Sequence, residues 1–248
     1  RNFCRARRMK TKYLEAVIAA GRASRSVALA TELKSGAQLL LDEGRFGGEL
    51  ALDDAQRAAM RDALRADRNV TLDTPAGRVF VQVFSPPRRC FVIGAVHIAQ
   101  PLTQMLALTE YRAIVIDPRQ SFATEARFPG VELTTDWPDE ALERLQPDHR
   151  SAIVTLTHDP KLDDPALAVA LRSECFYIGA LGSKRTHARR LERLTQLGFG
   201  ERDFARIRGP IGLPIGAVSQ AEIAISILAE MTQVLRKGAD VAARAEAA

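Results

Sequence analysis

The sequence is poor in cysteine and has no long apolar run. Its three cysteines, Cys4, Cys90 and Cys175, stand far apart in a chain of 248 residues, and no pair has the CxxC spacing of zinc ligands. A disulfide framework is therefore excluded, and we expect a reducing, cytoplasmic location. The longest stretch without a charged residue, 90–109, contains glycine, histidine, glutamine and proline, so we expect no membrane span.

A large excess of charge of one sign is also lacking, because 35 basic and 30 acidic residues leave a net charge of +5. Four of the arginines precede Met9, so a chain that begins at Met9 would have a formal charge of +1. Glu15 and Arg22 interrupt the short apolar run near the N-terminus, and we expect no signal peptide. The remaining basic excess gathers in residues 184–208. No RNA- or DNA-binding motif accompanies it, so it favours a small anionic ligand or an acidic partner, and no nucleic acid is expected.

What the sequence does contain is an ordinary globular composition, 46% hydrophobic and 26% charged, with a change of pattern at residues 85–89. Two consecutive prolines there favour an extended linker. Residues 10–84 are predicted to form a small α+β domain with antiparallel pairing. Its predicted elements are helices over 10–20 and 53–67, strands from residues 26 and 37, and a hairpin that turns at 74–77.

Residues 90–237 alternate short, continuous apolar runs with helical stretches. Such runs indicate strands that are buried on both faces of a parallel sheet. The sequence therefore predicts an α/β protein whose C-terminal part is a Rossmann-like, doubly wound sheet. The predicted strands begin at Cys90, Ala113, Val131, Ala152 and Phe176; the last helix covers 219–237, and a frayed tail covers 238–248.

Ligands of doubly wound sheets bind beyond the carboxyl ends of the strands, so polar residues at these ends are candidates for a site. The first such turn contains Gly94 and His97. A dinucleotide fingerprint would place glycine at 94, 96 and 99, but Val96 and Ala99 occupy the last two positions. Because the second glycine normally lets a pyrophosphate approach the backbone, Val96 is expected to obstruct the usual dinucleotide pose.

Two further strand ends have polar residues with alternative interpretations. Asp117 could accept hydrogen bonds from a ribose while Arg119 pairs with a phosphate, or the two could belong to a simple Asp-Pro turn. His158 and Asp159 could act as a base, orient a ligand or bind a metal. They could equally form an exposed turn, and no second spaced histidine supports a metal site.

The end of the fifth predicted strand is the most informative. Gly182 lies in the turn, Ser183 is the expected helix N-cap, and Lys184 and Arg185 fall in the first helical turn. Free N–H groups together with two cations at a helix start form an anion site, and cations there are unfavourable for the helix dipole unless an external anion binds. The later arginines 189, 190 and 193 are interpreted as a solvated helix face.

At these residues the sequence resembles the XdhC/CoxI family of xanthine dehydrogenase accessory proteins. The resemblance is carried by VTLTHDPKLDDPALAVALRS, FYIGALGSKRTHARRLERL and GPIGLPIGA…EIAISILAE, and it covers nearly all of 90–237. The sequence departs from the family pattern at Val96, Pro214 and Glu49, where members commonly have glycine, an acidic residue and cysteine. The last departure removes a family cysteine that could relay sulfur.

The resemblance implies a non-catalytic, dimeric factor that binds the molybdenum cofactor, as molybdopterin or its nucleotide form. It also implies that a cysteine desulfurase supports sulfuration of the cofactor and that a molybdenum hydroxylase such as xanthine dehydrogenase receives it. The alternative is an NAD(P)-dependent oxidoreductase or a nucleotide-binding module, since fold does not fix function. The cofactor-binding residues implied are Gly94, His97, Asp117, Arg119, His158, Asp159, Gly182, Ser183, Lys184 and Arg185.

Overall fold

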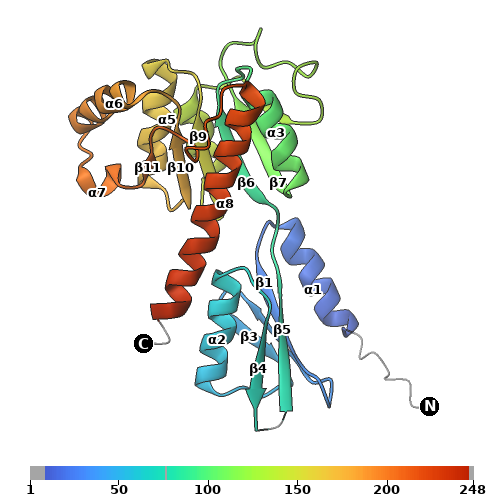
Figure 1. Ribbon diagram of the computed structural model, residues 1–248. Helices are drawn as coiled ribbons and strands as arrows, with labels where there is room; N and C mark the ends of the chain where they lie inside the picture. Colours follow the sequence, from blue (N-terminus) through green and yellow to red (C-terminus); the bar gives the residue numbers. More distant parts are fainter. Residues whose placement is uncertain (1–8, 76, 246–248) are drawn as a thin grey trace. The chain divides into compact units, whose positions relative to one another are not determined.

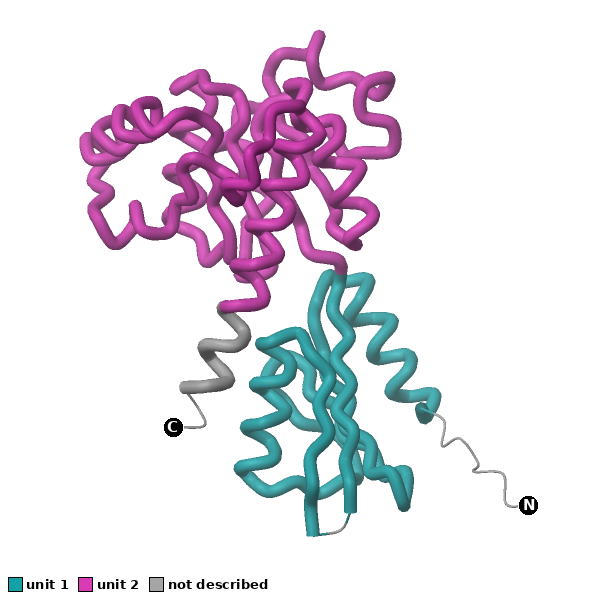
Figure 2. The backbone as a smooth tube through the Cα atoms, in the orientation of Figure 1, with its two compact units in different colours: residues 1–86 teal, residues 87–248 magenta. Residues whose placement is uncertain are grey.

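The computed structural model describes the backbone of residues 9–75 and 77–245, and side chains as far as residue 237. The chain forms two compact units, residues 1–86 and 87–248 (Figure 2). Across the described residues, no helix combines the length and apolar character needed to cross a bilayer.

The first unit is a five-stranded antiparallel sheet with the order β3-β2-β1-β5-β4 and two helices (Figure 1). One face of the sheet packs against α2, whose start is fixed by a capping box between Asp53 and Gln56 and whose Met60 is fully buried. This is the small α+β domain that the sequence predicts. Its elements are α1 (Thr11–Arg22), β1 (Val27–Glu32), β2 (Gln38–Asp42), β3 (Arg45–Gly48), α2 (Asp54–Arg65), β4 (Val70–Thr74) and β5 (Gly77–Phe84).

The second unit is built on a six-stranded sheet in the order β11-β10-β9-β6-β7-β8, with every pair parallel. This is the strand order of a doubly wound dinucleotide-binding fold, with the change of direction between β6 and β9. The strands are β6 (Arg88–Ile93), β7 (Tyr111–Ile116), β8 (Glu132–Thr134), β9 (Ser151–Thr155), β10 (Tyr177–Ala180) and β11 (Ile207–Arg208).

Helices cover both faces of this sheet because its central strands are apolar on both sides. On β6, Cys90 and Val92 face one core together with residues of α3 and α8, whereas Phe91 and Ile93 face the opposite core with residues of α4 and α5. The Rossmann-like prediction is thus confirmed. The helices are α3 (Ala99–Leu108), α4 (Pro138–Leu145), α5 (Pro160–Arg172), α6 (Lys184–Gln196), α7 (Glu201–Phe204) and α8 (Gln220–Ala245).

Several predicted boundaries change. Strand β6 already begins at Arg88, inside the predicted linker, and the short strands β3 and β11 were not predicted. Helix α8 continues past its predicted end at Lys237 to Ala245, through residues rich in the strong helix former alanine. The final residues of the predicted tail, 246–248, lie outside the described residues.

Candidate functional site

The turn after β6 is shaped by a close approach to the turn after β9. Gly94 has a φ of +102°, and a Cβ at this position would come within 2.4 Å of the Thr157 Cγ2 atom. Only glycine fits both the backbone conformation and the space. The two turns that flank the topological switch point are therefore packed directly against each other.

Asp117 and Arg119, at the end of β7, are paired with each other. Asp117 is fully buried; its Oδ2 accepts hydrogen bonds from the Ala95 N–H (2.8 Å) and Arg119 Nη2 (2.7 Å), and its Oδ1 accepts from the Arg119 N–H (3.0 Å) and Nε (2.8 Å). Burial raises the pKa of Asp117, but the hydrogen bonds and charge of Arg119 and the bond from the Ala95 N–H together outweigh it and hold the pKa below its ordinary value. A carboxylate offers about four acceptor positions, so these four bonds leave little capacity for the predicted ribose contact.

The turn after β9 is held by a buried carboxylate from the helix that follows it. Asp163, in the first turn of α5, accepts a 2.7 Å hydrogen bond from Thr157 Oγ1 and a 3.2 Å bond from the His158 N–H. This holds His158 in a left-handed conformation, with a φ of +63° and its side chain exposed. Asp159 serves instead as the N-cap of α5, accepting from the Lys161 N–H at 3.0 Å.

The turn after β10 leads into α6 as predicted. Gly182 has a φ of +139°, and the Ser183 Oγ atom caps the helix by accepting from the Thr186 N–H at 3.2 Å. Lys184 and Arg185 both lie in the exposed first turn, where helical N–H groups have no intrahelical acceptor. This end of α6 therefore offers both backbone donors and cationic side chains.

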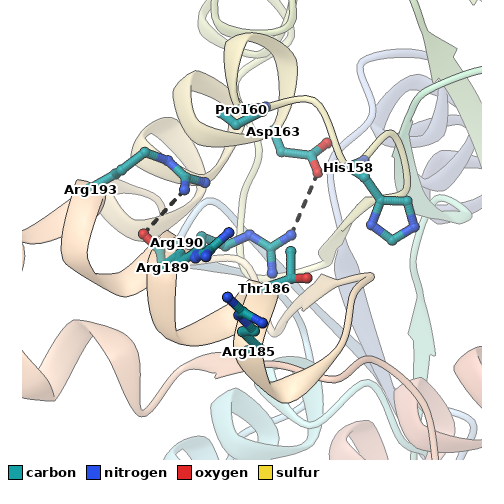
Figure 3. A pocket seen from close by; sticks show the side chains of 8 residues that line it. All are labelled: His158, Pro160, Asp163, Arg185, Thr186, Arg189, Arg190 and Arg193. Carbon is teal, nitrogen blue, oxygen red and sulfur yellow. Dashed lines mark hydrogen bonds and ion pairs between the residues drawn. The ribbon is translucent and has the colours of Figure 1, made fainter.

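A cavity of about 230 Å³ lies between the beginnings of α5 and α6 (Figure 3). Five of its eight lining side chains are arginine or histidine, and one, Asp163, is a carboxylate. Of the predicted residues the cavity brings together His158 and Arg185, while Lys184 is not part of its wall. The lining residues are His158, Pro160, Asp163, Arg185, Thr186, Arg189, Arg190 and Arg193.

Arg190 corrects the interpretation of the later α6 arginines as a solvated face. It is only 1% exposed, its Nη2 donates to the Leu181 carbonyl at 2.8 Å, and the same atom lies 3.6 Å from Asp163 Oδ2. Burial lowers the pKa of Arg190 and raises the pKa of Asp163, although each favours the charged form of the other. Arg193 is half-buried and forms a two-pronged ion pair with Asp164. The solvated-face interpretation survives for Arg189, which is exposed.

The side chains of this site are suited to binding an anionic ligand and less suited to reacting with one. Cys90 and Cys175 are buried, and burial raises the pKa of both thiols, which suppresses the reactive thiolate. Cys4 lies outside the described residues. Among the residues that the structure describes, no three His, Cys, Asp or Glu side chains are grouped to hold a metal ion. What is concentrated here is positive charge beside the carboxyl ends of β9 and β10.

Comparison with known proteins agrees with this architecture. The chain is 30% identical to a probable xanthine dehydrogenase subunit of Bacillus subtilis (strain 168), over 94% of this chain and 68% of that one. It is 32% identical to "Molybdenum cofactor insertion chaperone PaoD" of Escherichia coli (strain K12), over 61% of this chain and 41% of the chaperone. A crystal structure described as a xanthine dehydrogenase from Bacillus halodurans superposes with a TM-score of 0.69 at 26% identity, covering 91% of this chain and 64% of that chain.

The comparison with protein families covers more than half of the chain. Residues 90–231 match the XdhC Rossmann domain, and these residues contain most of the doubly wound sheet and every turn described above. The chain therefore belongs to the XdhC family.

Proposed function

We propose that this protein binds the molybdenum cofactor and delivers it to a molybdenum hydroxylase such as xanthine dehydrogenase, acting as a maturation factor and not as an enzyme. The observation that carries the proposal is the cationic cavity at the carboxyl edge of the parallel sheet, next to the switch point where such folds bind ligands. One relative is named as a molybdenum cofactor insertion chaperone, which supports the same role.

The residues present suit a phosphate-bearing pterin. Two buried guanidinium nitrogens of Arg190, Nε and Nη1, have no hydrogen-bond partner in the described part of the chain, and a guanidinium N–H can donate to an anionic oxygen. Arg185, His158 and the Gly182–Ser183 turn surround the same place and would hold the remainder of the anionic group. When bound, the cofactor supplies the molybdenum chemistry that the client enzyme uses.

The other predicted residues would contact the ligand outside this phosphate site or position the turns beside it. Gly94 and His97 belong to the neighbouring turn and would contact the ligand from the β6 side, where His97 is exposed. Asp117 and Arg119 would position that turn, because Asp117 binds the Ala95 N–H. Asp159 would act indirectly, because as the N-cap it fixes the start of α5.

Sulfuration of the bound cofactor is the part of the proposal that needs a partner. Cys90 and Cys175 are buried in the core, so neither could pass a sulfur atom to a ligand at the sheet edge in this conformation. We therefore propose that a cysteine desulfurase supplies sulfur directly to the bound cofactor. We also propose that this takes place in the cytoplasm and that the protein works as a homodimer.

Transfer to a client tests the proposal. Protein purified from cells that synthesise the cofactor would be mixed with a cofactor-free molybdenum hydroxylase, and hydroxylase activity would be followed over time. The proposal predicts activation that depends on the loaded protein and is absent with protein from cells unable to make the cofactor. Equal activation by both preparations would contradict it.

A further inference from the structure

Arg190 is a buried cation whose hydrogen-bonding capacity is only partly used. At 1% exposure it bonds to the Leu181 carbonyl through Nη2, while Nε and Nη1 have no hydrogen-bond partner among the residues that the structure describes. Buried polar groups without partners are rare in folded proteins, and for a guanidinium the cost is especially high. Arg190 lines the cavity, so an anionic group inside the cavity would lie next to this guanidinium (Figure 3).

The charges around the cavity do not balance. Arg193 is paired with Asp164, and Arg190 lies beside Asp163. Asp163 also accepts hydrogen bonds from the 157–158 turn, and it faces Arg190 through Nη2, so its charge does not provide a hydrogen-bond partner for Nε or Nη1. Four arginines and two aspartates leave an excess of two positive charges, which corresponds to Arg185 and Arg189.

The size of the cavity and the burial of Arg190 limit what can enter. Sites that enclose a whole drug-sized ligand usually measure about 300–1,000 Å³. A cavity of about 230 Å³ is therefore suited to one end of a larger ligand. Arg190 is almost inaccessible to solvent and lines this cavity, so a group that contacts it must arrive as the terminus of a molecule. A doubly substituted diphosphate has an organic group at each end and does not meet this requirement.

We propose that this cavity is a binding site for a terminal phosphate, in which Arg190 is the buried ligand and Arg185 closes the entrance. A phosphate monoester carries up to two negative charges, which matches the unbalanced charge of the cavity. That the phosphate belongs to a pterin rests on the proposed function. In that case the site selects the cofactor form that ends in a phosphate over the dinucleotide form.

Inorganic phosphate tests the site independently of the cofactor. Calorimetric titrations at constant ionic strength would compare the full-length protein with Arg185→Ala, Arg190→Lys and the control Lys161→Ala, which removes an exposed cation of α5 outside the cavity. We expect saturable phosphate binding that is weakened at least tenfold by Arg185→Ala and by Arg190→Lys, and less than twofold by Lys161→Ala. Circular dichroism would establish that each variant is folded. If Arg190→Lys fails to fold, Arg185→Ala still tests the site, because Arg185 is exposed and its replacement should not disturb the core.

Competition then distinguishes the kinds of phosphate. Glycerol phosphate, a monoester, should displace inorganic phosphate, whereas NAD, whose diphosphate is substituted at both ends, should not. Absence of saturable phosphate binding, or equal weakening by Lys161→Ala and Arg185→Ala, would overturn the site. Displacement by NAD as effective as by glycerol phosphate would overturn its selectivity for a terminal group. Phosphate binding in a protein that binds no molybdenum cofactor would leave this site in place and contradict the proposed function instead.

Discussion

The contact between Gly94 and Thr157 predicts a specific coupling between the two turns at the switch point. Replacing Gly94 with alanine forces an L side chain into a φ of +102° and places its Cβ 2.4 Å from Thr157 Cγ2. The backbone term is about 1–2 kcal/mol and the overpacking term about 1–3 kcal/mol. We therefore expect Gly94→Ala to lower the free energy of unfolding by about 3 kcal/mol in all.

Two variants separate these terms. Gly130→Ala meets a φ of +70° with open space around the new Cβ, so it reports the backbone term alone. Thr157→Ser removes the clashing methyl group but keeps the hydroxyl that bonds to Asp163. In the Thr157→Ser background, the cost of Gly94→Ala should fall by about the 1–3 kcal/mol of the overpacking term, toward the range of a backbone cost such as that of Gly130→Ala. Urea titrations would measure the unmodified protein, the single variants and the double variant, and strictly additive effects of Gly94→Ala and Thr157→Ser would refute the close packing of the two turns.

Three other predictions concern pH, nucleotide binding and ligand retention. Burial and the nearby Arg190 lower the pKa of His187 below its ordinary 6.5, so the folded state binds this proton less tightly than the unfolded chain. The free energy of unfolding should fall as the pH drops below 6.5, and urea titrations should show a smaller fall for His187→Gln; equal falls would contradict the assignment. Calorimetry should show NAD binding weaker than about millimolar, because Val96 is expected to obstruct the approach of a pyrophosphate to the backbone; micromolar binding would favour the oxidoreductase alternative. His158→Ala should reduce cofactor retention while shifting the melting temperature by only a few degrees, since the side chain is exposed; a large loss of stability with normal retention would mark it as structural.

The sheet of the second unit could be predicted because its central strands are marked by apolar runs in their own sequence. Strands β6 and β9 are continuous apolar runs, and burial on both faces follows directly from that pattern. Strand β11 has only two residues, and β3 contains two exposed glycines, so neither carries a periodic signal. Both depend on pairing with a neighbouring strand, which the local sequence does not encode.

The local roles of residues at the strand ends could be predicted from the sequence, but most of their contacts could not. The sequence predicts Gly182 in the turn and Ser183 as the N-cap of α6 because turn glycines and N-caps have short-range signatures, and the structure confirms these two local roles. Arg190 was assigned to a solvated face, since its neighbours in the sequence are polar and basic. Its burial arises because α6 lies beside α5, which brings Asp163 within ion-pair distance. Asp117 and Arg119 are predicted to contact a ligand, which stays a prediction; in the structure they bind each other, two residues apart, and Asp117 also binds the Ala95 N–H. The contacts of Arg190 with Asp163 and of Asp117 with Ala95 are tertiary, and a single sequence does not display them.

The central claim, that this protein holds the molybdenum cofactor, is tested most directly by analysing what it carries. The protein would be purified from cells that synthesise the cofactor, oxidised, and its released pterin quantified by fluorescence against the amount of chain. An unrelated protein with the same affinity tag would serve as the control. The account predicts pterin in the purified protein well above the control, and its loss in folded Arg185→Ala. Pterin at the control level in correctly folded protein would contradict the account.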